Sequence, residues 1–89
     1  MMRSDLYSAI QPDFEDLLLT GEYAVHHVFP GRNRKKCEKY GFLMALRPWA
    51  HEEIHQNPGG AADQSLRKMC HDYWTKNIGT EDEFRREFY

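Results

Sequence analysis

The sequence predicts one small α+β domain, in which a ββα unit follows an N-terminal helix and precedes two C-terminal helices. Three observations lead to this class. The chain has 89 residues, of which 40% are hydrophobic and 29% charged, and this suits a single globular domain with a modest core. Two short segments, 23–29 and 42–46, have the aromatic and aliphatic content of strands. Residues 61–89 instead repeat apolar side chains at helical spacing.

The N-terminal part, residues 1–22, is expected to form a helical cover over the core. Pro12 suits the first turn of a helix, and acidic residues follow it near the positive end of the helix dipole. Phe14, Leu17 and Leu18 fall on one helical face, and Gly21 suits the C-terminal cap. The segment therefore predicts a short helix that turns one apolar face toward the core.

The central part, residues 23–57, is predicted to contain two paired strands and a helix. Pro30 and Gly31 end the first strand, and the segment 42–46 returns beside it as an antiparallel hairpin. The long connection, residues 32–40, lacks strand alternation and ends at Gly41, so either a short helix or a structured loop is expected. Pro48 then favours a helix start, and residues 49–56 form about two turns before the breakers at 57–60.

The C-terminal part, residues 61–89, is predicted to be two helices. Apolar residues follow the i, i+3, i+4 rule in the first helix, with Asp63 as the expected N-cap and Gly79 as its end. Thr80 and Glu83 have the spacing of a capping box, which opens the last helix. The aromatic side chains expected in the core or at its edge are Trp49, Tyr73, Trp74, Phe84, Phe88 and Tyr89.

Charge and hydropathy exclude several classes of protein. The longest uninterrupted apolar stretch, residues 42–46, is too short to cross a bilayer, so no membrane contact is expected. Cys37 and Cys70 allow at most one disulfide, and a reducing cytoplasm is the expected location. The net charge is −2, but the segment 32–39 holds five basic residues and one acidic residue, which leaves −6 for the rest. The sequence therefore predicts one cationic patch on an acidic body.

Four of the five histidines fall into two close pairs. His26 and His27 are neighbours in the first predicted strand, so they can point to opposite faces and serve different purposes. His51 and His55 are one turn apart on one face of a helix, which is the separation at which two imidazoles share a metal ion. The hairpin could bring all four together, although an isolated pair at this spacing is more often incidental. A shared site would suit Zn²⁺, Ni²⁺, Cu²⁺ or Mn²⁺ better than Mg²⁺ or Ca²⁺.

Residues 51–55 also satisfy the H-E-x-x-H string of metallopeptidases, with Glu52 in the position of the general base. This alternative requires a longer helix and a third ligand downstream. The breakers at 57–60 stop the helix too early, and only His71 or an acidic residue could supply that ligand. His71 otherwise stands alone and is not assigned to a site.

The arrangement of a histidine pair at a strand end, a loop, a second strand and a helix with closing histidines resembles the HNH endonucleases, which are the ββα-metal or His-Me finger nucleases. The H-x-x-x-H ending at residues 51–55 is similar to that in the DNase domains of the colicins. Residues 26–41 resemble the core of short HNH proteins encoded by prophages. This likeness runs from about residue 21 to residue 57 and continues more loosely to the C-terminus.

The resemblance implies a metal-dependent endonuclease of phage or prophage origin, acting in the cytoplasm of a bacterial host. It assigns His27 as the general base, and His26, His51 and His55 as ligands of one divalent ion, which is Zn, Ni, Mn or Mg. Two further candidate catalytic residues are Arg34 and Arg47, of which Arg47 either braces the transition state or forms a salt bridge. The residues expected to hold phosphates are Arg32, Arg34, Lys35, Lys36 and Lys39.

The chain departs from the family pattern at two places. Residues 47–50 replace the Cys-x-x-Cys of many relatives, so no zinc knuckle is expected, and the second strand lacks the middle Asn that braces the loop of the base. Asn33 lies too early to replace it. The expected partner is double-stranded DNA, bound with low sequence specificity, and a homodimer or a phage or host protein could supply further contacts. The alternative from another class is a non-catalytic HNH-like binding module, such as a phage inhibitor of a host protein, with a structural metal.

Overall fold

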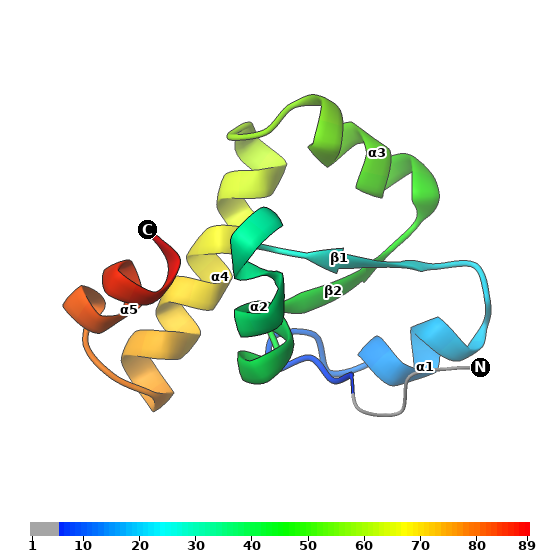
Figure 1. Cartoon of the computed structure of the whole chain (residues 1–89). Helices are drawn as coiled ribbons and strands as arrows, with labels where there is room; N and C mark the ends of the chain where they lie inside the picture. Colours follow the sequence, from blue (N-terminus) through cyan, green and yellow to red (C-terminus); the bar gives the residue numbers. More distant parts are fainter. Residues whose placement is uncertain (1–5) are drawn as a thin grey trace.

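The computed structural model describes residues 6–89 and has the predicted α+β class (Figure 1). Residues 1–5 of the expected N-terminal cover lie outside the described residues. The elements are, in chain order, α1 (Phe14–Leu19), β1 (Ala24–His27), a 3₁₀ turn η1 (Gly31–Asn33), α2 (Arg34–Tyr40), β2 (Leu43–Leu46), α3 (Pro48–Gln56), α4 (Ala61–Asn77) and α5 (Glu81–Phe88).

The two strands form the predicted antiparallel pair, with Ala24 opposite Leu46 and His27 opposite Leu43. The basic connection between them is a helix rather than a loop, since η1 leads directly into α2. Gly41 ends α2 with a φ of +76°, and a Cβ there would lie 2.7 Å from the backbone nitrogen of Ala9. Only glycine fits this turn, which returns the chain from α2 into β2.

The segment before α1 lies along the outer edge of β2. The amide side chain of Gln11 replaces a strand partner, because its Oε1 accepts from the backbone N–H of Ala45 at 2.7 Å and its Nε2 donates to the Ala45 carbonyl at 3.2 Å. The Ser8 hydroxyl donates to the Leu43 carbonyl at 2.6 Å. These bonds cover an edge that would otherwise expose unpaired backbone groups.

The core lies between the sheet, α2 and the pair α4 and α5. Phe29 and Phe42, which flank the strands, contact Phe88 at ring-centroid distances of 4.6 and 5.4 Å. Trp74 of α4 packs against Phe84 of α5 at 5.8 Å. Cys37 and Cys70 are both buried as free thiols, so the one possible disulfide is not formed.

The capping box of the last helix is confirmed by the bonds between Thr80 and Glu83. The expected roles of Asp63 and Trp49 are wrong. Asp63 is not the N-cap of α4, because the helix begins two residues earlier after Gly60. Its buried carboxylate instead accepts from the backbone N–H of Gly59 at 2.8 Å and from Arg67. Trp49 is not part of the core, since it is 69% exposed at the start of α3.

Tyr89, which was expected to pack, is also exposed, although its ring contacts that of Phe29 edge-on at 5.8 Å. Within residues 6–89, no helix has the length and apolar character needed to cross a membrane.

Candidate metal centre

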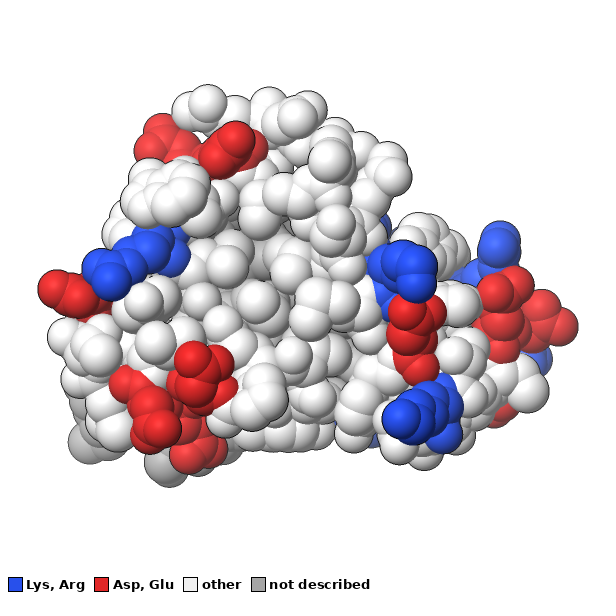
Figure 2. Space-filling model, turned by 180° about the vertical axis from the view of Figure 1, so that it is seen from behind, with Lys and Arg blue, Asp and Glu red and all other residues white. Residues whose placement is uncertain are grey.

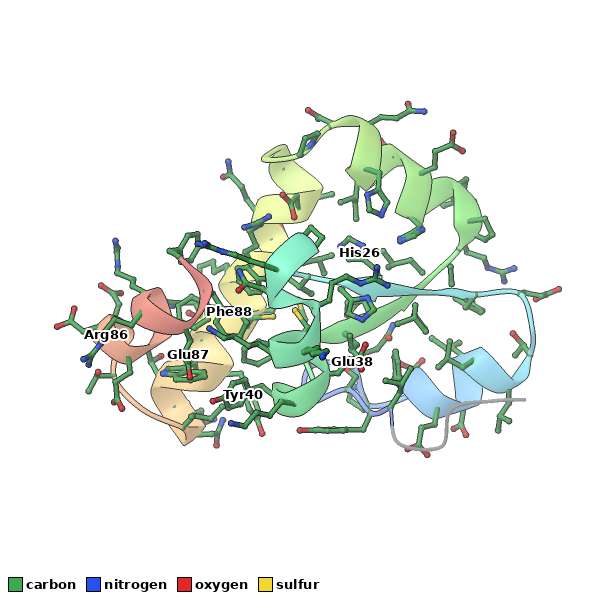
Figure 3. The ribbon with its side chains drawn as sticks, viewed as in Figure 1. His26, Glu38, Tyr40, Arg86, Glu87 and Phe88 are labelled. Carbon is green, nitrogen blue, oxygen red and sulfur yellow. The ribbon has the colours of Figure 1, made fainter. Side chains whose placement is uncertain are left out.

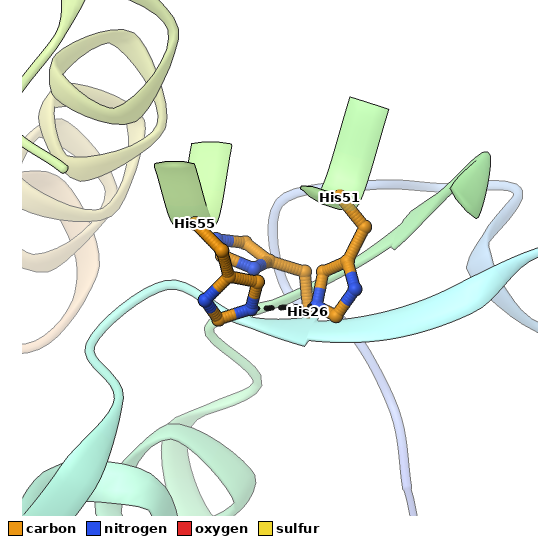
Figure 4. A group of neighbouring side chains, drawn as sticks. All are labelled: His26, His51 and His55. Atoms are coloured by element: carbon orange, nitrogen blue, oxygen red, sulfur yellow. Dashed lines mark hydrogen bonds between the residues drawn. The ribbon is translucent and has the colours of Figure 1, made fainter. Parts of the chain in front are cut away.

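Three of the predicted ligands meet where β1 passes below α3 (Figure 4). Pro48 occupies the first turn of α3, and this start sets the helical phase that turns His51 and His55 toward the strand. His26 occupies the third position of β1 and points to the same space. The hairpin and the i, i+4 spacing therefore act together, as the sequence predicted, to gather histidines that are 25 and 29 residues apart in the chain.

The distances suit coordination of one ion. One ring nitrogen from each histidine can be chosen so that all three lie within 4.8 Å of one another. The Nε2 atoms of His51 and His55 are 3.1 Å apart, a separation that also allows a hydrogen bond between the two rings. Two nitrogens held at about 2.0–2.1 Å by a tetrahedral Zn²⁺ lie about 3.3–3.4 Å apart. The third ring, that of His26, offers a nitrogen within 4.8 Å of both of the others.

His26 is the most unusual of the three residues. Only 2% of it is exposed, and neither of its ring nitrogens has a hydrogen-bond partner among residues 6–89. Burial of polar atoms without partners is unfavourable and rare in folded proteins. One of the two His26 nitrogens lies within 4.8 Å of a ring nitrogen of His51 and of His55. The ring centroids of those two residues lie 5.2 and 5.7 Å from that of His26. A cation bound among the three rings would give one of these nitrogens its missing partner.

The electrostatics favour the neutral form of His26 and His51, which is the state of an imidazole that binds metal. Burial, and after it the nearby His51 and His55, lower the pKa of His26 to about 4. Burial also lowers the pKa of His51, with His55 as the next cause. Three neutral imidazoles fit Zn²⁺, Ni²⁺ or Mn²⁺, whereas Mg²⁺ prefers oxygen ligands and fits this donor set poorly. With three protein ligands, at least one coordination position is left for water or substrate.

His27, the predicted general base, is not part of this group of three. It points to the other side of β1, where its Nε2 lies 2.9 Å from Oε2 of Glu38 on α2. Glu38 is labelled in Figure 3, below His26 and close to the strand. The sequence did not reveal this partner, because Glu38 stands out there only as the one acidic residue of a basic segment. A sequence signal for this contact would have been the position of Glu38 one helical turn after Arg34, and it depends on residues 34–40 forming a helix.

The predicted phosphate-binding residues divide into two groups. Arg32, Arg34, Lys35 and Lys39 are exposed on η1 and α2. Lys36 instead turns to α5, where its Nζ donates to the Glu87 backbone carbonyl at 2.7 Å and lies 3.1 Å from the Glu87 carboxylate. The opposite face of the molecule, seen from behind in Figure 2, shows a broad centre without acidic or basic side chains. Four of the five predicted cations are therefore exposed on η1 and α2, while Lys36 is held by α5.

Arg47, a candidate catalytic residue, and Asn33, which lies too early to replace the family's middle Asn, both make structural contacts. Arg47 lies 3.2 Å from the Glu22 carboxylate and stacks over the Tyr23 ring at 4.6 Å, which matches the salt bridge that was one of its two expected roles. Asn33 donates its amide N–H to the Phe88 carbonyl at 3.1 Å. Its side chain thus ties η1 to α5.

The geometry does not favour the metallopeptidase alternative. Glu52 is exposed and accepts a hydrogen bond from Gln56 at 3.1 Å, one turn further along α3. His71 is on α4, where its two ring nitrogens lie 3.1 Å from Asp72 and 2.9 Å from Glu81. The third histidine beside His51 and His55 comes from β1 instead.

No protein-family model matches the chain, and neither a curated protein nor a solved structure gives a match. The case for a function consequently depends on the residues of the site itself.

Proposed function

We propose that the protein is a metal-dependent endonuclease and that β1, β2 and α3 form a ββα-metal module. The observation that carries the proposal is His26, a buried histidine without hydrogen-bond partners for its ring nitrogens, one of which lies within 4.8 Å of a ring nitrogen of both His51 and His55 on α3. A module of this kind needs a divalent ion, a histidine that can act as the base and a cationic surface for phosphates. The chain has candidates for each of these parts within residues 26–55.

The roles follow from the chemistry of each side chain. His26, His51 and His55 would hold the ion, which when bound would stabilise the negative charge that develops on the phosphate during hydrolysis. His27, next in sequence to His26 but on the other face of β1, accepts a proton from the attacking water. The exposed cations of η1 and α2 hold the phosphate backbone without reading bases, so the preferred substrate is DNA with low sequence specificity.

A cleavage assay on supercoiled plasmid tests this proposal. Wild-type protein is stripped with EDTA and assayed with Zn²⁺, Ni²⁺, Mn²⁺ or Mg²⁺, beside His27→Ala and His51→Ala variants. We expect His27→Ala to retain the ion and lose cleavage, and His51→Ala to lose both. His71→Ala removes a histidine outside the site and is the matched control, which should cleave as the wild type does.

Metal binding without cleavage by the wild type with any of the four ions would overturn the nuclease proposal. That outcome would favour the alternative of a binding module with a structural metal. A Glu52→Gln variant adds a check on the peptidase alternative, which requires this carboxylate, whereas the nuclease does not.

A further inference from the structure

We propose that Glu38 is a positioning residue, which fixes the tautomer and the orientation of His27 so that Nδ1 is the nitrogen that accepts the proton. This inference rests on the proposed nuclease function and names a residue to which the resemblance to HNH proteins assigns no role. The contact that carries it is the 2.9 Å approach of His27 Nε2 to Glu38 Oε2.

The direction of this hydrogen bond determines the tautomer. An ionised carboxylate can only accept hydrogen bonds, so Nε2 must carry the hydrogen and donate it to Glu38. In a neutral imidazole the lone pair then belongs to Nδ1. The side chains of His27 and Glu38 are 11% and 25% exposed, so water competes only weakly for this bond.

The backbone around Glu38 is fixed to the same strand that carries His27. The neighbouring residue, Cys37, is fully buried, and its Sγ lies 3.3 Å from both the backbone nitrogen and the carbonyl oxygen of Phe29. The Cys37 carbonyl in turn accepts from the N–H of Phe42 at 2.9 Å. Because α2 is tied to both strand ends beside Glu38, the carboxylate meets His27 in one defined place.

The side chains of strand β2, LMAL, carry neither an amide nor a carboxylate, so none of them can provide this restraint. The helix between the strands takes that role in this chain.

In the reaction, the Nδ1 lone pair takes a proton from water while the water oxygen bonds to phosphorus. The bond from phosphorus to the 3′ oxygen breaks, and solvent protonates the leaving oxygen. In this proposal Glu38 acts through His27, whose Nε2 it contacts.

Two readouts test the inference on the full chain. Multiple-bond ¹H–¹⁵N NMR of the EDTA-treated protein reports which nitrogen of His27 carries the hydrogen, with a His27→Gln spectrum for assignment. Steady-state cleavage of a short DNA duplex at one pH separates kcat from KM. The variants are Glu38→Ala and Glu38→Gln, and Glu15→Gln is the charge-matched control on the exposed side of α1.

We expect the wild type to show the Nε2–H form of His27 and Glu38→Ala to show a mixture of tautomers. Its kcat should fall about 10–100-fold, as for other residues that orient a functional histidine, while KM and the affinity for Zn²⁺ change less than about twofold. Glu38→Gln, whose side-chain oxygen can still accept from Nε2, should keep the tautomer and recover part of the rate. Glu15→Gln should match the wild type in both readouts.

An unchanged tautomer in Glu38→Ala, or an unchanged kcat with a shifted tautomer, would overturn the inference. If Glu38→Ala does not fold, the Glu38→Gln and Glu38→Asp variants decide, since both keep an accepting oxygen and differ in reach. A wild type that does not cleave DNA would defeat the proposed function. In that case the NMR result still shows whether Glu38 sets the tautomer of His27, so the two failures are distinguishable.

Discussion

Acid should destabilise the metal-free protein because His26 is buried in its neutral form. Its pKa is about 4 in the folded chain, where burial and then the proximity of His51 and His55 lower it, and 6.5 is the ordinary value. Between these two values the unfolded chain binds more protons than the folded chain. The free energy of unfolding therefore falls as the pH falls from about 6.5 to about 4.

The size of this effect follows from the two pKa values. At about 1.4 kcal/mol for each pKa unit, His26 alone removes about 3 kcal/mol once the pH is below 4. Most of this loss, about 2 kcal/mol, is complete at about pH 5. For a domain with a total stability of about 5–15 kcal/mol this is a large fraction. The lowered pKa of His51 acts in the same direction.

Urea unfolding in EDTA, followed by the fluorescence of the buried Trp74, measures this dependence. A His26→Phe variant keeps a ring in the space and cannot titrate, so the difference between its stability and that of the wild type isolates His26 from the carboxylates. His71→Gln is the opposite case, because hydrogen bonds to Asp72 and Glu81 raise the pKa of His71 and make its protonation stabilising. The contribution of His71 is complete below about pH 6.5 and is lost as the pH rises, so the stability difference between wild type and His71→Gln should be largest below pH 6.5 and shrink above it. Equal pH profiles for wild type and His26→Phe would refute the reasoning.

Three further predictions concern the metal and the cations. Zn²⁺ at about 100 times its Kd should stabilise the wild type by about 2.7 kcal/mol. Differential scanning fluorimetry should show this as a rise of about 10–20 °C in Tm, and Zn²⁺ should not raise the Tm of His51→Ala. Lys35→Gln should reduce the slope of log Kd for duplex DNA against log salt concentration by about 1. Lys36→Gln should leave that slope unchanged, because Lys36 bonds to α5. Arg47→Ala should lower stability by about 1 kcal/mol or less in urea unfolding and leave plasmid cleavage within about twofold, because its exposed partner Glu22 gives a weak ion pair.

The histidine group was predictable because its geometry follows from local rules. A pair at i, i+4 on a helix shares a face whatever the tertiary structure, and a hairpin must return its second strand beside the first. His26, His51 and His55 therefore meet as soon as residues 24–27 pair with residues 43–46. The capping box of Thr80 and Glu83 was predictable for the same reason, since both of its bonds lie within one turn.

The features that the sequence did not reveal depend on how elements pack. Glu38 reaches His27 only because the basic connection is a helix docked on the strands, and residue 38 alone does not show which face it occupies. Lys36 appeared equivalent to Lys35, yet helical phase turns it toward Glu87 of α5. Trp49 looked like a core residue by composition, but α3 turns its histidine face inward and leaves the tryptophan on the opposite side.

The position of His26 is the strongest structural argument for the proposed metal site. A domain of 89 residues has a small core, and each buried polar group without a partner costs about 1–3 kcal/mol in such a core. A leucine or phenylalanine at residue 26 would avoid that cost, because the rest of β1 and β2 already packs against apolar side chains. Binding of a divalent ion would reverse the sign of the contribution, since three converging imidazoles then join a strand to a helix through one centre. Stability measured with and without Zn²⁺ in wild type and His26→Phe tests this directly: the variant should be the more stable protein in EDTA, and the wild type should be the more stable one in Zn²⁺.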